Sequence, residues 1–181
     1  MKKLLVLAFT VLLTQWAFAQ DQKASLEKGL ASVDIGFLGS WLTYERQVGD
    51  QLTLNTQLGL EGGFFGGGGE FNYAFTPTVS VEPRFYYNFS RRVAKQKKTI
   101  NNSANYLTIT GTYIPGLFTV TDDDVEAEAA FNLIPKWGVR RTIGKQFKFD
   151  FAVGYGVAFR QSETAGQLGL DLKIGYIFYK K

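Results

Sequence analysis

The sequence predicts an all-β fold, an eight-stranded antiparallel up-and-down transmembrane β-barrel, and three observations support this class. Apolar and polar residues alternate with a period of two in eight separate stretches, which is typical of strands with two different faces. After residue 29, no window shows the period of 3.6 that marks a helix. The chain of 181 residues is 15% aromatic and has 20 Gly but only 4 Pro, a composition that favours strands and turns.

The N-terminal segment is predicted to be a secretory signal peptide. Lys2 and Lys3 precede an apolar stretch at 4–13, and Ala17-Phe18-Ala19 supplies the small-x-small pattern before a cleavage site. The apolar stretch is too short to cross a bilayer as a helix. The predicted organisation is a signal peptide, a short polar periplasmic leader and the barrel, at residues 1–19, 20–29 and 30–181.

Each expected strand carries its apolar residues at every second position. In the fourth stretch they occupy the odd positions from Val79 to Phe89, and in the seventh those from Phe147 to Phe159. The eight stretches lie at residues 31–37, 42–48, 52–60, 79–89, 107–113, 131–139, 147–159 and 168–178. The split between the first two rests on Gly39-Ser40, and without it the count would be seven. Bacterial single-chain barrels have an even number of strands, which favours the split.

The links between the expected strands alternate between short and long. Residues 49–50 and 144–146 are short enough for tight hairpin turns. The long links lie at 62–74, 117–130 and 161–167. This alternation is expected when turns lie on one side of a membrane and loops on the other, and it places both termini on the turn side. Two links depart from it, since 39–40 is short where a loop is due and 91–105 is long where a turn is due.

Volume and charge indicate which face meets lipid. An eight-stranded barrel is only wide enough inside to be filled by ordinary side chains, so the face rich in Phe, Tyr, Trp and Leu would overfill it. The opposite face carries small residues and six acids against six bases, a balance that a closed interior needs because an unpaired buried charge is costly. The predicted lumen charge network is Asp34, Glu45, Glu61, Glu82, Arg84, Lys136, Arg140, Lys148, Asp150, Arg160, Asp171 and Lys173. The alternative is a soluble barrel of the lipocalin kind, with its apolar face inside.

Aromatic residues near the strand ends are expected to form two girdles at the lipid interface. The turn-side girdle is Tyr44, Tyr87, Phe89, Tyr176 and Phe178, and the loop-side girdle is Phe37, Tyr113 and Phe159. The bulky face carries two charged residues, Arg46 and Arg141, near the turn-side ends of their strands. There a long side chain reaches the interface at little cost.

Three stretches carry a resemblance to a known family: LTYER at 42–46, EPRFYYN at 82–88 followed by Arg91-Arg92, and GYIFY at 175–179. With the signal peptide, they make the chain resemble the small bacterial outer-membrane β-barrel proteins of the OmpX and OmpA-transmembrane-domain type. The resemblance implies an integral outer-membrane protein with periplasmic termini. It also implies outer-membrane lipids, lipopolysaccharide and the outer-membrane assembly machinery as partners. Lys180 and Lys181 depart from the aromatic ending that this machinery reads.

Composition excludes several kinds of chemistry. Without His or Cys there is no Ser-His-Asp triad, no Cys nucleophile, no His-ligated metal and no disulfide, and we expect neither an enzyme nor a cofactor. The formal net charge of +4 falls to +2 without the signal peptide, which holds two Lys and no acid, so no nucleic-acid partner is expected.

Four clusters are candidate sites. The acidic run Asp122, Asp123 and Asp124 is a solvated loop or a weak divalent site, since it lacks the EF-hand spacing. The glycine run at 66–69 lacks the Lys-Ser/Thr of a phosphate loop. The basic turn at 91–98 is a solvated turn or contacts lipid head groups or a periplasmic partner. Glu82 and Arg84, with Glu45 expected nearby across the strands, fit a salt-bridge plug better than a pair of carboxylates acting as acid and base.

These observations predict a non-enzymatic outer-membrane barrel with a charge-plugged polar lumen and a role in envelope integrity or surface interaction. The main alternative is a narrow pore for water or small ions, which the polar lumen would permit. An enzyme at the outer leaflet and a soluble periplasmic binder are the other two classes.

Overall fold

The computed structural model describes residues 25–65, 72–121, 128–161 and 163–181. The predicted signal peptide, the glycine run at 66–69 and the acidic residues Asp122, Asp123 and Asp124 lie outside the described residues.

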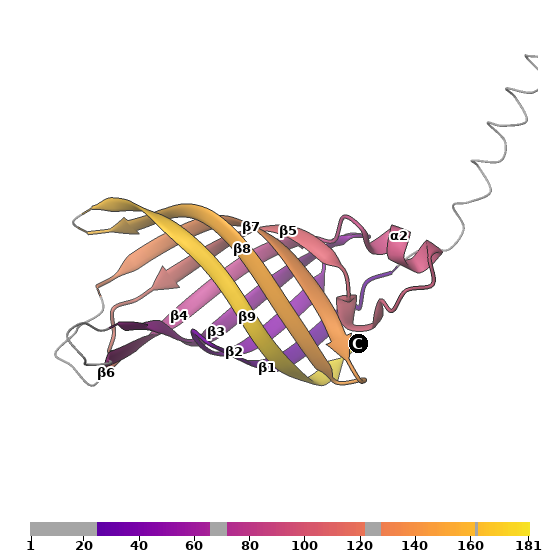
Figure 1. Ribbon diagram of the computed structural model, residues 1–181, viewed down its shortest axis with the longest axis horizontal. Coiled ribbons are helices and arrows are strands. Elements are labelled where there is room, and N and C mark those ends of the chain that lie inside the picture. The colour runs from indigo at the N-terminus through magenta and orange to yellow at the C-terminus, as the bar shows by residue number, and fades with distance from the viewer. Residues whose placement is uncertain (1–24, 66–71, 122–127, 162) are drawn as a thin grey trace, which may run out of the picture.

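The described chain forms one antiparallel sheet whose hydrogen bonds run through eight strands and close into a ring (Figure 1). Around the ring the strands follow in the order β1, β2, β3, β4, β5, β7, β8 and β9, and β9 pairs with β1. Their bounds are β1 (Gly29–Gly36), β2 (Gly39–Gln47), β3 (Leu52–Phe65), β4 (Asn72–Phe85), β5 (Asn105–Ile114), β7 (Ala130–Ile143), β8 (Phe147–Arg160) and β9 (Thr164–Lys180). The all-β class and the eight antiparallel strands predicted from the alternation are thus confirmed.

Three shorter elements distinguish the two ends of the ring. The short strand β6 (Val120–Thr121) pairs with β4 at one end, which we call the β6 end. The helix α2 (Phe89–Ala94), the 3-10 turn η1 (Ile100–Asn102) and the C-terminus lie at the other, the α2 end (Figure 1). Within the described residues, no helix has the length and apolar character needed to cross a membrane.

The predicted split between the first two strands is confirmed, and the turn lies two residues earlier than expected. Gly36 pairs with Gly39, so Phe37 and Leu38 form a two-residue hairpin loop. Gly39 has φ +147, and an added Cβ would lie 2.0 Å from the Leu60 carbonyl oxygen. Only glycine fits this backbone position, which explains why the chain can reverse here.

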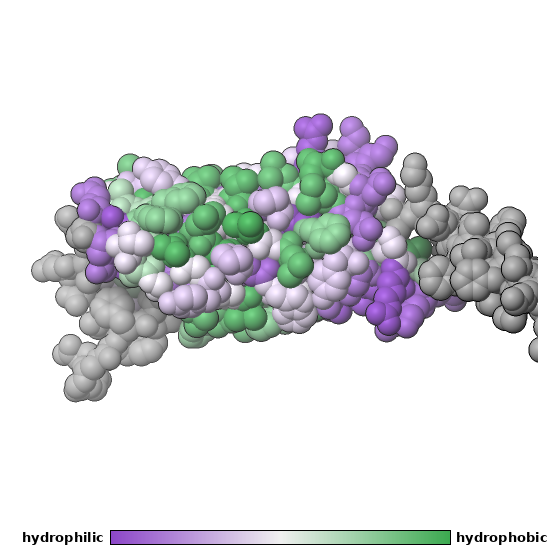
Figure 2. Space-filling view, turned by 90° about the horizontal axis from the view of Figure 1, so that it is seen from above, coloured by the Kyte–Doolittle hydropathy of each residue, from purple (hydrophilic) through white to green (hydrophobic). Residues whose placement is uncertain are grey.

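Side chains alternate between the inside and the outside of the ring along every long strand. On β2, for example, Thr43 and Glu45 are buried inside, whereas Leu42 and Tyr44 are exposed outside. This follows from the pleat, which points successive side chains to opposite faces. Figure 2 shows hydrophobic residues across the middle of the visible face and hydrophilic ones gathered toward its ends.

The α2 end is closed by an apolar cluster that the alternation did not predict. The sequence placed Phe89 on the outer face with Val79 and Tyr87, but strand β4 ends at Phe85. Phe89 begins α2, is only 2% exposed, and packs in a cluster with Leu26, Tyr86, Ala104, Tyr106 and Ala152. The prediction of Phe89 as an interface aromatic is therefore wrong, because the chain turns away from the sheet direction before reaching it.

The long link between β4 and β5 contributes to the same closure. Asn101 and Asn102 have φ of 56 and 60, a left-handed conformation that Asn tolerates better than most residues, and both are fully buried. The Asn102 Oδ1 accepts a hydrogen bond from the Glu27 backbone N–H at 2.8 Å, which ties residues before β1 to the link. Lys180 Nζ lies 2.6 Å from Glu27 Oε1, and this ion pair ties the end of β9 to the residues before β1. The link is long because its residues cover the α2 end of the interior.

Candidate functional site

The interior of the ring holds a network of buried ion pairs, and Arg140 on β7 is its most enclosed member. The residue is 0% exposed. Arg140 Nε donates to Oδ1 and Oδ2 of Asp150 on β8 at 2.9 and 3.1 Å, and its Nη1 donates to Glu45 on β2. One guanidinium thus joins a carboxylate on the neighbouring strand β8 to a carboxylate on β2, across the ring.

Glu45 accepts further hydrogen bonds near the α2 end. The Tyr86 hydroxyl donates to Glu45 Oε1 at 3.0 Å, and Asn102 Nδ2 donates to the same oxygen at 2.8 Å. Tyr86 lies just beyond β4, and burial raises its pKa above the ordinary value for tyrosine. The hydroxyl therefore stays protonated and acts as a donor. The apolar cluster and the charge network meet at this residue.

Glu82 on β4 forms the middle of the network. It accepts hydrogen bonds from Arg84 Nε at 2.7 Å, Asn55 Nδ2 at 3.0 Å and Thr110 Oγ1 at 3.0 Å. Arg84 also lies 3.5 Å from Asp150, and its guanidinium carbon lies 4.5 Å from the centre of the Tyr106 ring. Asp150 therefore connects the Glu82 group to the Arg140 group.

Asp34 on β1 and Lys148 on β8 form a second branch. Lys148 Nζ lies 3.1 Å from Asp34 Oδ2 and 3.5 Å from Asp150 Oδ2, and Thr43 Oγ1 donates to Asp34 at 2.6 Å. Gly175 on β9 faces this pair. A Cβ there would lie 1.9 Å from Asp34 Oδ1, so the absence of a side chain makes room for the ion pair.

A third group lies toward the β6 end and is centred on Asp171 of β9. Lys136 Nζ lies 2.7 Å from Asp171 Oδ2, and Lys173 Nζ lies 3.1 Å from Asp171 Oδ1. Lys173 also donates to Gln57 Oε1 at 3.0 Å and lies 3.8 Å from the centre of the Trp41 ring. One carboxylate therefore compensates both ammonium groups, and Lys173 has a polar and an aromatic neighbour in addition.

Ten of the twelve residues predicted for the interior are buried and joined by these ion pairs. The group contains five acids and five bases: Asp34, Glu45, Glu82, Asp150, Asp171, Arg84, Lys136, Arg140, Lys148 and Lys173. The other two differ. The Arg160 side chain is 39% exposed and pairs with Glu163 at 3.1 Å. Arg160 and Glu61 line a cavity of about 210 Å³ at the β6 end.

Aromatic side chains also lie inside the ring, where the sequence predicted mainly small and charged residues. Trp41, Tyr86 and Tyr106 are buried among the charged groups. The Tyr106 ring lies over Gly138, where an added Cβ would be 2.3 Å from a ring carbon. Their positions in the alternation could have predicted this, because each of these aromatics falls on the face of its strand that carries the small and polar residues.

The predicted interface aromatics other than Phe89 all lie on the outside of the ring. They are between 41% and 68% exposed: Phe37, Tyr44, Tyr87, Tyr113, Phe159, Tyr176 and Phe178. Tyr87 is fixed in place, since its hydroxyl accepts hydrogen bonds from Trp137 Nε1 at 3.0 Å and from Asn105 Nδ2 at 3.3 Å.

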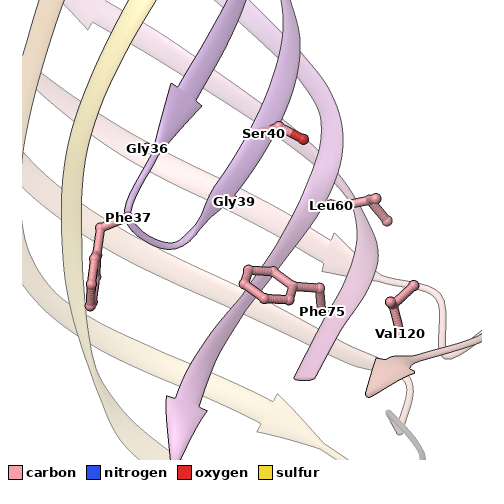
Figure 3. A pocket seen from close by; sticks show the side chains of 7 residues that line it. All are labelled: Gly36, Phe37, Gly39, Ser40, Leu60, Phe75 and Val120. Carbon is pink, nitrogen blue, oxygen red and sulfur yellow. The ribbon is translucent and has the colours of Figure 1, made fainter. Parts of the chain in front are cut away.

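An apolar hollow of about 350 Å³ lies on the outside near the tip of the β1–β2 hairpin. Figure 3 shows the side chains of Phe37, Leu60, Phe75 and Val120 around this tip. The hollow exists because β1 and β2 stop at Gly36 and Gly39, whereas β3 and β4 continue further toward the β6 end.

Within the described ranges, no group of three or more His, Cys, Asp or Glu side chains is placed to hold a metal ion. The acidic run at 122–124 lies outside those ranges. No family model, curated protein or solved structure matches this chain.

Proposed function

We propose that the chain is an integral β-barrel protein of a bacterial outer membrane, with an interior closed by its charge network. The observation that carries this proposal is the distribution of side chains. Large apolar residues are exposed around the outside of the ring, and ion pairs are buried within it. A protein dissolved in water would have the reverse arrangement, because leaving a large apolar side chain exposed costs about 1.5–3 kcal/mol.

Strand length supports the same proposal. A tilted strand needs about 9–11 residues to cross the hydrocarbon core of a bilayer. The two shortest strands of the ring, β1 and β2, have 8 and 9 residues, and the other six have between 10 and 17. The resemblance to OmpX-type proteins agrees with this number of strands and this length.

The proposed orientation places the α2 end in the periplasm and the β6 end outside the cell. Both described ends of the chain lie at the α2 end, with the β2–β3 and β7–β8 turns. Outer-membrane barrels have their short turns on the periplasmic side. The proposed partners are outer-membrane lipids and lipopolysaccharide around the barrel and the assembly machinery during biogenesis.

The proposed role is non-enzymatic, in envelope integrity or in surface interaction through the links at the β6 end. Ion pairs around Arg140, Lys148 and Asp171 occupy the interior, and the apolar cluster around Phe89 covers the α2 end. Ion pairs with several hydrogen bonds are held firmly, because each partner left alone would be an uncompensated buried charge. Such an interior favours a plug over a channel.

A narrow pore for water or small ions is the second candidate. The cavity of about 210 Å³ at the β6 end favours it, because Thr78, Thr112, Asn132 and Gln167 are among the residues that line it. Conduction would require the Asp171 and Glu82 groups to separate. The two candidates thus differ in whether the interior ion pairs stay closed in a bilayer.

Two measurements on protein expressed from its full coding sequence test this function. The first is co-flotation with phospholipid vesicles, together with a gel band that shifts on heating. We expect both, and protein that stays in solution without detergent would overturn the membrane proposal. The second is single-channel recording in a planar bilayer. Silence from folded, inserted protein supports the plug. Discrete steps that change with Glu82→Gln or Arg84→Gln would establish the pore instead.

A further inference from the structure

A strongly basic pocket lies on the outer perimeter of the ring at the α2 end. It has a volume of about 400 Å³. Four of its cations, Arg91, Arg92, Lys95 and Lys97, come from the link after β4, and Arg141 comes from the outer face of β7. Two separate parts of the chain therefore direct positive charge into one volume. Neither the charge network nor the proposed plug uses these residues.

The pocket differs from the interior in that its cations lack acidic partners. Its lining contains no Asp or Glu, and in the described part of the chain none of the five cations forms a salt bridge. By contrast, each of the five interior bases pairs with a carboxylate. Five cations around one small volume repel one another, so an anion bound there would relieve the repulsion.

Two of the three arginines, Arg92 and Arg141, are held in place by neutral acceptors. Arg92 Nη2 donates to the Lys98 carbonyl oxygen at 2.9 Å, and Arg141 Nη2 donates to Asn105 Oδ1 at 2.7 Å. Arg92 Nε is shielded from solvent and has no hydrogen-bond partner among the described residues. Partial burial lowers the pKa of Arg92, the direction expected for a guanidinium without an acidic neighbour. The arginine side chains are therefore held in position, but no negative charge balances them.

The pocket opens beside exposed apolar surface. Its edge includes Tyr87, whose hydroxyl is bonded to Trp137. Leu107 on β5 is the register partner of both Phe85 on β4 and Trp137 on β7, so these three form a row across the outer face. All three are exposed by 40% or more. A ligand in the pocket would thus have its charged part among cations and a path over apolar side chains.

We propose that this pocket binds the phosphate head group of an anionic phospholipid, with an acyl chain lying over Phe85, Leu107 and Trp137. The inference rests on the proposed membrane function, because the acyl chain needs a bilayer. Basic residues placed beside an apolar membrane surface are known determinants of binding to acidic head groups. A free phosphate or a soluble polyanion would use the cations but leave the row of apolar side chains without a role.

The test is native mass spectrometry of protein purified from membranes in detergent and equilibrated with equal amounts of phosphatidylglycerol and phosphatidylethanolamine. We expect phosphatidylglycerol to be retained about tenfold more than phosphatidylethanolamine, with about a fivefold loss of affinity for each cation removed.

The first variant is Arg91→Gln with Lys95→Gln and Lys97→Gln, whose side chains are exposed. The second is Arg92→Gln with Arg141→Gln. The matched control is Arg46→Gln, an exposed arginine of β2 that does not line the pocket.

Four outcomes are distinguished, three that decide the inference and one that decides the proposed function. Loss of the preference in both variants but not in the control supports the inference. Equal retention of the two lipids by protein that floats with vesicles overturns the inference and leaves the membrane function standing. Displacement of the lipid by millimolar inorganic phosphate alone would overturn the lipid assignment in favour of a free anion. Wild-type protein that fails to float would instead overturn the proposed function, and the vesicle experiment detects this separately.

Discussion

Arg140 and Asp150 lie directly opposite each other on β7 and β8, and the arginine Nε donates to both oxygens of the carboxylate, at 2.9 and 3.1 Å. The regular register of these two strands therefore creates a buried ion pair. Asp150 also lies within 3.5 Å of Arg84 and Lys148, so the pair is the junction of two branches of the network. Removing either partner would leave the other charge buried.

Arg140→Gln is expected to lower the free energy of unfolding by about 3–5 kcal/mol, because Glu45 and Asp150 lose their main compensating charge. Unfolding in urea, followed by the heat-sensitive gel band, measures this. The control is Arg46→Gln, which removes an exposed charge and should cost about 1 kcal/mol or less. Equal losses in the two variants would show that the interior ion pair contributes nothing beyond a surface charge.

Leu58→Arg tests which medium surrounds the outer face. Leu58 is 58% exposed near the middle of β3. In a bilayer this substitution should cost about 2–4 kcal/mol, whereas on a surface in contact with water it should change stability by about 0.5 kcal/mol or less. Folding equilibria in phospholipid vesicles give the value. Val48→Arg, at a residue 56% exposed beside the β2–β3 turn, should cost only about 0–1 kcal/mol. A neutral Leu58→Arg would argue against a membrane-spanning wall.

Gly138→Ala is expected to destabilise the fold by about 1–3 kcal/mol through overpacking. The added Cβ would lie 2.3 Å from the Tyr106 ring, which also packs against Tyr86 with ring centres 5.5 Å apart and so has little room to move. The temperature at which the gel band shifts is a sufficient measurement. Gly49→Ala serves as the control, because the nearest atom to its added Cβ would be Leu52 Cβ, at an ordinary contact distance of 3.4 Å. The prediction fails if both variants shift equally.

Phe89→Ala tests the apolar closure of the α2 end. We expect a loss of about 3 kcal/mol, the usual cost of emptying a buried Phe site. We also expect faster protease cleavage between 91 and 105, because Phe89 anchors the start of that link against Leu26 and Tyr106. Limited proteolysis and urea unfolding check the two effects. Phe178→Ala, on the exposed outer face, should leave cleavage in the link unchanged.

Much of the strand pattern was predictable, but strand ends were not. The alternation placed the third strand at 52–60, whereas β3 runs to Phe65, and it began the last strand at 168, whereas β9 begins at Thr164. In both places glycine and small polar residues interrupt the apolar period, so the pattern stops before the backbone pairing does. The α2 helix was missed because six residues are too few to show a helical period.

The sequence alone determined the division of each strand into two faces, the balance of charges on one face and the identity of most interior residues. These follow from the pleat, a local property in which each residue's side is fixed by counting along the chain. The tertiary structure alone decided which charges meet. Arg140 joins Glu45, 95 positions away, because the sheet closes on itself and brings β2 and β7 to face each other. The same closure explains why Phe89 and part of the link after it are buried. Once the sheet closes into a ring, its interior opens at the α2 end, and these residues cover that opening.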